Sequence, residues 1–81
     1  MNTNEIKLKE TISKVLKINI DLVTEDASPD TIEAWDSLAH MNLVIALEEA
    51  FHIELTDDQV IEILSYKLIK IILSEQGVQF T

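Results

Sequence analysis

Ser37 is the residue of this chain whose surroundings best suit covalent chemistry. It lies in the stretch Trp35-Asp36-Ser37-Leu38, directly before a helical pattern that extends to Phe51. A serine in the first turn of a helix exposes its hydroxyl beside free backbone N–H groups, at the positive end of the helix dipole. Such a position favours the negative charge of a phosphate ester. Serine and aspartate are also ordinary helix N-caps, so a purely structural role is the simplest alternative.

His40 raises a second kind of chemistry, because it lies one helical turn after Ser37 and a Ser–His nucleophilic pair must be considered. A serine hydrolase also needs a group that orients the imidazole, an oxyanion hole and a walled pocket, and no residue here plainly supplies them. His40 is therefore expected to edge the core or to shield whatever Ser37 carries. His52 is about 18 Å further along the same helix, too far for a shared metal site. No catalytic residue and no metal ligand is expected.

Four helices must position Ser37. Apolar residues at helical spacing predict helices over about residues 3–17, 37–52, 57–64 and 65–75. Thr56-Asp57-Asp58-Gln59 is a capping box that begins the short third helix, and Ser65 can cap the fourth. Asn2 or Thr3 can cap the first. The chain has one glycine, one proline and no cysteine, so it favours helices stabilised by apolar packing alone.

Residues 18–36 form a long connection between the first two helices. Four apolar residues are expected to dock parts of it on the core: Ile18, Ile20, Leu22 and Val23. Ser28-Pro29-Asp30 marks a turn, and Trp35 is expected to anchor the loop against the second helix. Loops of this length in a compact domain are usually functional or disordered, and the apolar anchors favour an ordered one. The tail from Gly77 is expected to be frayed.

The second helix is apolar on two sides. Its core side is expected to hold Leu43, Leu47, Ala50 and Phe51. A second stripe with acidic neighbours is predicted to be a docking surface for partner proteins: Leu38, Met41, Ile45, Glu48 and Glu49. The alternative is that the apolar members of this stripe pack under the long loop or the third helix. In the fourth helix, Ile69 and Ile72 are among the residues expected to be buried, together with Tyr66 and Leu73.

The charge of the chain is strongly uneven. The net charge is −9, and residues 18–66 contain twelve of the fifteen acids and no lysine or arginine. This surface would repel nucleic acid and attract proteins with basic patches, although acidity also simply favours solubility. The most apolar window, 60–73, is too short to span a bilayer and contains three charged residues. No signal peptide is visible, so we expect one monomeric domain over residues 1–81 in the cytoplasm.

The sequence resembles a known family over about residues 5–75. Asp-Ser-Leu at a helix start, after a long acidic loop and before Leu43, Leu47, Glu48, Glu49 and Phe51, resembles the second-helix signature of acyl and peptidyl carrier domains. The resemblance implies an all-α, four-helix acyl-carrier-like bundle with a short third helix and a long ordered loop between helices 1 and 2. It also implies that Ser37, flanked by Asp36, bears 4'-phosphopantetheine, which a separate phosphopantetheinyl transferase attaches from coenzyme A with magnesium.

The resemblance further implies a non-catalytic carrier that holds acyl or aminoacyl groups as thioesters. Its partners would be an acyl-loading ligase or synthase and acyl-transfer enzymes, in fatty-acid or polyketide biosynthesis. Trp35 before the motif, and Ala39, Asn42 and Ala50 at positions that are often acidic, look more like a stand-alone or specialised-pathway carrier than the housekeeping fatty-acid one. The cargo is expected to fold between the helices or to stay in solvent, depending on its chain length, and loosening of the short third helix would admit an acyl chain to the core. The alternative is an acidic helical interaction adaptor without the arm.

Overall fold

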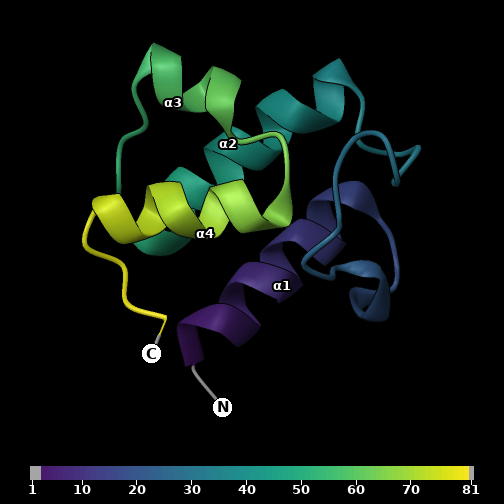
Figure 1. The fold of residues 1–81 in the computed structure, drawn as a ribbon, viewed down its shortest axis with the longest axis horizontal. Helices are drawn as coiled ribbons and strands as arrows, with labels where there is room; N and C mark the ends of the chain where they lie inside the picture. Colours follow the sequence, from purple (N-terminus) through teal and green to yellow (C-terminus); the bar gives the residue numbers. More distant parts are fainter. Residues whose placement is uncertain (1–2, 81) are drawn as a thin grey trace.

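The computed structural model describes residues 3–80, and within that range the chain is all-helical and contains no strand. Its elements are α1 (Thr3–Leu16), the short 3₁₀ helix η1 (Ile20–Leu22), α2 (Ser37–Phe51), α3 (Asp57–Glu62) and α4 (Tyr66–Glu75). Figure 1 shows α4 in front of α2, with α1 crossing below them and α3 at the top. The predicted four-helix bundle with a short third helix and a long loop is confirmed. An N-cap at Asn2 lies outside the described residues.

One apolar core joins the helices and the long loop. Each of α1, α2 and α4 buries a stripe of side chains three or four residues apart, as amphipathic helices do. The buried residues of the helices are Leu8, Ile12, Leu16, Leu43, Val44, Leu47, Tyr66, Ile69, Ile72 and Leu73. The prediction for α4 is confirmed at all four positions. No residue of α3 is fully buried, because its six residues form too short a helix to present a complete stripe.

The long loop is ordered against the core, but not through all the residues predicted to dock it. Val23, Ala27, Ile32 and Trp35 are buried. Ile20 and Leu22 are exposed, so the prediction that they dock was wrong. They belong to the three-residue η1, which turns only its C-terminal neighbour Val23 towards the core. The turn predicted at Ser28 is confirmed, since its carbonyl accepts the N–H groups of Thr31 and Ile32 at 3.1 and 2.9 Å.

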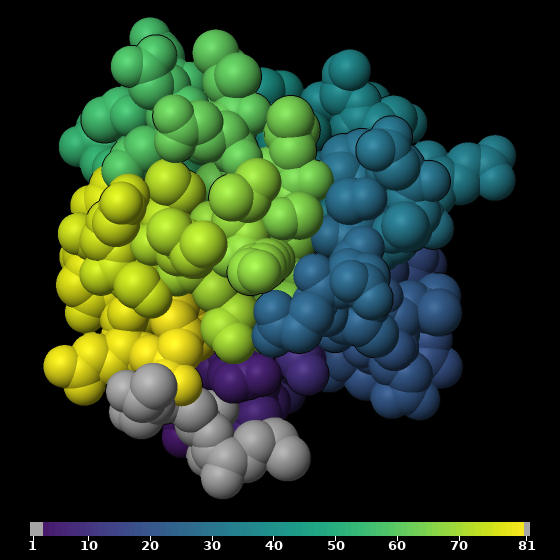
Figure 2. All heavy atoms as spheres, in the orientation of Figure 1, coloured from purple at the N-terminus to yellow at the C-terminus, as the bar shows by residue number. Residues whose placement is uncertain are grey.

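The loop and α4 meet along one face of the molecule, which Figure 2 shows as the contact between blue and yellow-green surfaces. The N–H of Tyr66, the first residue of α4, donates to the carbonyl of Ala27 at 2.9 Å. Lys70 of α4 also lies 3.5 Å from a carboxylate oxygen of Glu25. The loop is thus joined to α4 at its middle, which leaves its last residues free to lead into α2.

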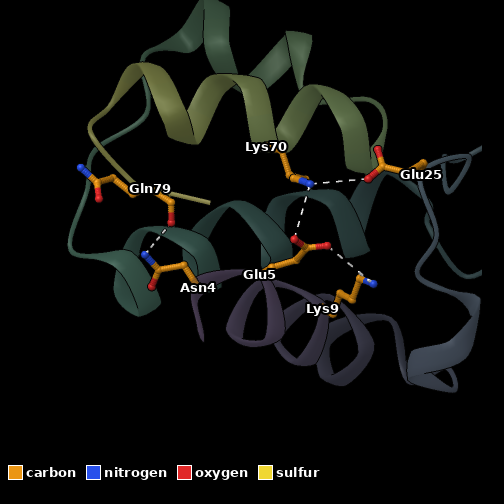
Figure 3. Close-up of polar contacts among 6 residues, drawn as sticks. All are labelled: Asn4, Glu5, Lys9, Glu25, Lys70 and Gln79. Atoms are coloured by element: carbon orange, nitrogen blue, oxygen red, sulfur yellow. Dashed lines mark hydrogen bonds and ion pairs between the residues drawn. The ribbon is translucent and has the colours of Figure 1, made fainter. Parts of the chain in front are cut away.

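Ion pairs and a hydrogen bond close the side of the molecule where α1, α4 and the tail come together (Figure 3). Lys70 lies 3.8 Å from Glu5 as well as 3.5 Å from Glu25, and Lys9 lies 3.9 Å from Glu5. Asn4 donates from its side-chain amide to the carbonyl of Gln79 at 2.9 Å. Residues 77–80 therefore lie against the start of α1, while fraying of the tail stays a prediction about its motion.

Candidate functional site

Ser37 is the first residue of α2 and its side chain is exposed. The preceding residue, Asp36, is the N-cap, and its carboxylate accepts the N–H of Ala39 at 2.8 Å. Because Asp36 caps the helix, the hydroxyl of Ser37 is not needed for capping. The N–H groups of Ser37 and Leu38 belong to the first turn of α2, where no preceding residue of the helix can accept them. The hydroxyl therefore lies at the positive end of a fifteen-residue helix.

Trp35 fixes the direction in which the chain enters α2. Its side chain is only 3% exposed, and its backbone N–H donates to the carbonyl of Ile32 at 3.0 Å. The indole Nε1–H donates to Nδ1 of His40 at 3.1 Å, and the two rings stack with centroids 6.3 Å apart. The expected role of Trp35 as an anchor of the loop against α2 is confirmed. The buried Trp35 thus fixes the position of the two residues that follow it, Asp36 and Ser37.

His40 joins α2 to α3. Its Nε2 lies 2.8 Å from the carbonyl oxygen of Val60 in α3. An indole N–H can only donate, so Nδ1 of His40 is the acceptor, and Nε2 must carry the proton that is donated to Val60. Both ring nitrogens are therefore engaged away from Ser37. The imidazole is not directed at the serine hydroxyl as the base of a Ser–His pair would be.

A hollow of about 590 Å³ lies beside Ser37, between the end of the long loop, the start of α2 and α3. Its walls include Met41 of α2, Val60 and Ile61 of α3, and Leu64 just after α3. Val60, Ile61 and Leu64 were not predicted from the sequence to belong to the site. The short length of the third helix could have indicated them, because a helix of six residues cannot bury every apolar side chain that it carries.

The second stripe of α2 is exposed as expected. Leu38, Met41 and Ile45 are 73%, 51% and 52% exposed, so they do not pack under the loop or α3. Glu49 is also exposed. Glu48 differs from it, because its carboxylate accepts the N–H of Leu55 at 2.9 Å and so holds the connection between α2 and α3. The geometry leaves docking at this stripe as a prediction, with Glu48 also committed to the fold.

Within the described range 3–80, no group of three His, Cys, Asp or Glu side chains could hold a metal ion. His52 is the C-cap of α2, in the left-handed conformation with φ of 53°. None of the helices described is both long enough and apolar enough to cross a membrane.

The fold and the site together define a class: a small helical bundle that presents one exposed serine at the start of its second helix, beside an apolar hollow. The family model described as "Phosphopantetheine attachment site" matches residues 7–69. The chain is 42% identical over 59 residues to the acyl carrier protein of Buchnera aphidicola subsp. Schizaphis graminum (strain Sg), covering 72% of this chain and 73% of that protein. It is 43% identical over 60 residues to the acyl carrier protein of Guillardia theta, covering 72% and 74%.

The chain therefore belongs to the acyl carrier protein family. Its cofactor is a covalent 4'-phosphopantetheine group, and its role is that of a non-catalytic carrier.

Proposed function

We propose that Ser37 is the attachment residue, and that the chain holds acyl or aminoacyl groups there as thioesters and presents them to partner enzymes. The observation that carries the proposal is the exposed hydroxyl of Ser37 at the first position of α2, with Asp36 as the cap. A phosphodiester at this position is favoured by the helix dipole and by first-turn N–H groups. The apolar hollow beside Ser37 fits the rest of the arm. The group supplies the thiol that this cysteine-free chain lacks.

The residues around Ser37 also indicate what a transferase must contribute. The phosphopantetheinyl transferase joins the oxygen of Ser37 to the phosphopantetheine phosphate of coenzyme A, with magnesium. The pyrophosphate bond of coenzyme A breaks, 3',5'-ADP leaves, and the serine hydroxyl gives up its proton. The imidazole of His40 is bound by Trp35 and Val60 and cannot take the serine proton in this arrangement. The transferase must therefore supply the base. The carrier contributes an accessible nucleophile of fixed position and a helix terminus that favours the product.

The partner surface is proposed to be the second stripe of α2, in which all but the half-buried Glu48 are exposed: Leu38, Met41, Ile45, Glu48 and Glu49. Apolar side chains beside acids fit partners with an apolar patch and basic surroundings. Such partners are the transferase, an acyl-loading ligase or synthase, and acyl-transfer enzymes of fatty-acid, polyketide or a related specialised biosynthesis. The net charge of −9 supports association with basic protein surfaces rather than with nucleic acid. We expect the carrier to act as a monomer in the cytoplasm.

Intact mass tests the attachment residue. The purified chain is incubated with coenzyme A, magnesium and a broad-specificity phosphopantetheinyl transferase, alongside Ser37→Ala and the control Ser74→Ala, which removes an exposed serine of α4. The parent and Ser74→Ala should gain the mass of one phosphopantetheine group, and Ser37→Ala should gain none. Far-UV circular dichroism should show that Ser37→Ala keeps its helices, since alanine suits a first helical turn.

The same reaction tests the docking stripe. Leu38→Ala and Glu49→Gln should slow the gain in mass, because each removes a proposed contact with the transferase. The final extent should be unchanged, because both residues are exposed and their replacement leaves the core intact. A gain that persists in Ser37→Ala would overturn the assignment of the serine. No gain in the parent with several transferases would favour the acidic adaptor.

A further inference from the structure

We infer that His40 determines the kind of cargo this carrier takes: it closes the passage from Ser37 into the core, so that the cargo stays in the surface hollow between α2 and α3. The inference rests on attachment at Ser37. It assigns His40 a positioning role, because its imidazole acts through the helix that it holds. The cargo class that follows is a short acyl or aminoacyl group rather than a long apolar chain.

The turns of α2 give the route that a chain attached at Ser37 would follow into the core. Residues three or four apart lie on the same side of a helix, so Ser37, His40, Val44 and Leu47 follow one another along α2 towards the interior. Leu47 is fully buried and Val44 is 5% exposed. His40 is the half-buried residue between the exposed serine and these core side chains. A chain that starts at Ser37 and passes between α2 and α3 meets the imidazole first.

The imidazole is held firmly in this position. Trp35 donates to Nδ1 at 3.1 Å and stacks on the ring, and Trp35 is itself buried. Nε2 donates to the carbonyl of Val60 at 2.8 Å. Val60 lies in the last turn of α3, where carbonyls lack the helical partner that a longer helix would supply. By this one hydrogen bond, His40 supplies a donor to a carbonyl group in the last turn of α3 and connects α3 to α2.

α3 depends on such contacts from outside itself. A helix of six residues is too short to be stable alone. Thr56 and Gln59 form the capping box at its start, and Gln76, the C-cap of α4, donates to the side chain of Gln59 and to the carbonyl of Glu54. At the other end, His40 supplies the contact to Val60. Removing the imidazole therefore frees the end of α3 that lies nearest to Ser37, while the capping box still holds the other end.

The space outside this closure suits small cargo. The hollow of about 590 Å³ has mostly apolar walls, and Met41, Ile61 and Leu64 in those walls are 51%, 68% and 50% exposed. A short acyl group attached at Ser37 can cover these side chains and be covered by them. A long chain held there would leave methylene groups in water, which the hydrophobic effect opposes. With the route past His40 closed, such a chain has no buried place to go.

Nuclear Overhauser contacts to methyl groups test where the chain lies. The phosphopantetheinylated protein is loaded with a butyryl or a decanoyl group, in the parent, in His40→Ala and in the control His52→Asn. Asparagine tolerates the left-handed conformation of residue 52, so the control changes a histidine away from α3. In the parent and the control, the decanoyl chain should contact Met41, Ile61 and Leu64. In His40→Ala it should contact the buried Leu47 and Ile63, and its thioester should react more slowly with hydroxylamine.

Two results would overturn the inference. One is a decanoyl chain that contacts Leu47 and Ile63 in the parent, and the other is an identical pattern in the parent and His40→Ala. If α3 is unfolded in unloaded His40→Ala, the variant His40→Gln is used in its place, because the glutamine amide can donate to the carbonyl of Val60 without a ring stacked on Trp35. The contacts of the decanoyl chain in His40→Gln should then be intermediate between those in the parent and those expected for His40→Ala. Failure of the arm to attach shows as an absent mass gain before loading, which is distinct from failure of the closure.

Discussion

The two sides of this molecule are built differently. Where α1, α4 and the tail meet, lysines pair with acids and cover aromatic rings: Lys70 bridges Glu5 and Glu25, and its ammonium lies 5.6 Å from the ring of Tyr66. Where α2 meets α3, acids and apolar side chains are exposed, and a few hydrogen bonds position a six-residue helix. Packing and ion pairs therefore stabilise one side, while the other side presents exposed side chains, where we propose that partners bind.

The distribution of lysines and acids along the chain explains this difference between the two sides. All six lysines lie outside residues 18–66, in α1, in α4 or directly after α1. Glu5 of α1 and Glu25 of the nearby loop therefore have lysine partners within the chain. Residues 18–66, which include α2 and α3, contain no lysine or arginine, so the acids of that side have no basic side chain of their own segment to pair with.

The largest expected effect compares one isoleucine from each side. Ile69 of α4 is fully buried, and Ile61 of α3 is 68% exposed. Ile69→Ala should lower the free energy of unfolding by about 2–5 kcal/mol, since it removes core contacts and leaves a cavity. Ile61→Ala should change it by less than about 0.5 kcal/mol. Urea denaturation measures both, and equal losses would mean that the α3 side is packed as tightly as the α4 side.

Alkaline pH should destabilise the fold through Tyr66, which lies on the side where α1, α4 and the tail meet. Its side chain is buried, and among the described residues its hydroxyl has no hydrogen-bond partner. Burial raises the pKa of Tyr66 well above its usual range, and the carboxylates of Glu5 and Glu25 raise it further. The unfolded chain then loses the phenol proton before the folded chain does. The contribution of this group to stability is level below about pH 10 and falls above it, by up to about 1.4 kcal/mol per pH unit.

Tyr66→Phe checks this assignment. The variant should be as stable as the parent at pH 7 or slightly more stable, because it removes a buried hydroxyl without a partner. Between pH 10 and 11 it should lose less stability than the parent when thermal unfolding is followed by circular dichroism. Parallel curves for the two proteins would mean that the phenol ionises in the folded state.

Loss of a helix cap should have a smaller effect on stability, and its consequences should differ between α3 and α4. Thr56 caps α3 and Ser65 caps α4, and each side-chain oxygen accepts one backbone N–H at 3.1 Å. Loss of either cap should cost about 1 kcal/mol. Thr56→Ala should speed amide exchange mainly in α3, whereas Ser65→Ala should lower the stability of the whole fold, because α4 is part of the core. Exchange measured residue by residue separates these outcomes, and a global loss in Thr56→Ala would contradict the separation.

The smallest effect comes from neutralising one surface carboxylate on each side. Glu25→Gln removes a partner of Lys70 and should lower the melting temperature slightly. Glu33→Gln removes an exposed acid from the loop on the acidic side and should raise it. Each change corresponds to no more than about 1 kcal/mol and should shrink as salt screens the charges. Scanning calorimetry at low and high ionic strength measures both, and shifts of the same sign would refute the contrast.

Much of the fold followed from local patterns in the sequence. Asp36 at the start of α2, the Thr56–Gln59 capping box and the Ser65 cap all act through hydrogen bonds within three residues, so adjacent letters are enough to identify them. The buried set of α4 follows from helical periodicity, which also predicted a second apolar stripe on α2 but left open whether that stripe is exposed or packed. The same local chemistry placed Ser37 at the start of a helix.

The tertiary structure decided the contacts between distant segments. His40 and Val60 are twenty residues apart, and their bond depends on how α3 folds back over α2. The same packing gives Ile61 and Leu64 to the hollow and engages Glu48 with Leu55. It also left Ile20 exposed, because a three-residue turn can direct only part of its apolar surface inwards. The sequence alone determined the helices, their caps and the position of Ser37 at the start of α2, whereas only packing across long separations decided what surrounds that serine.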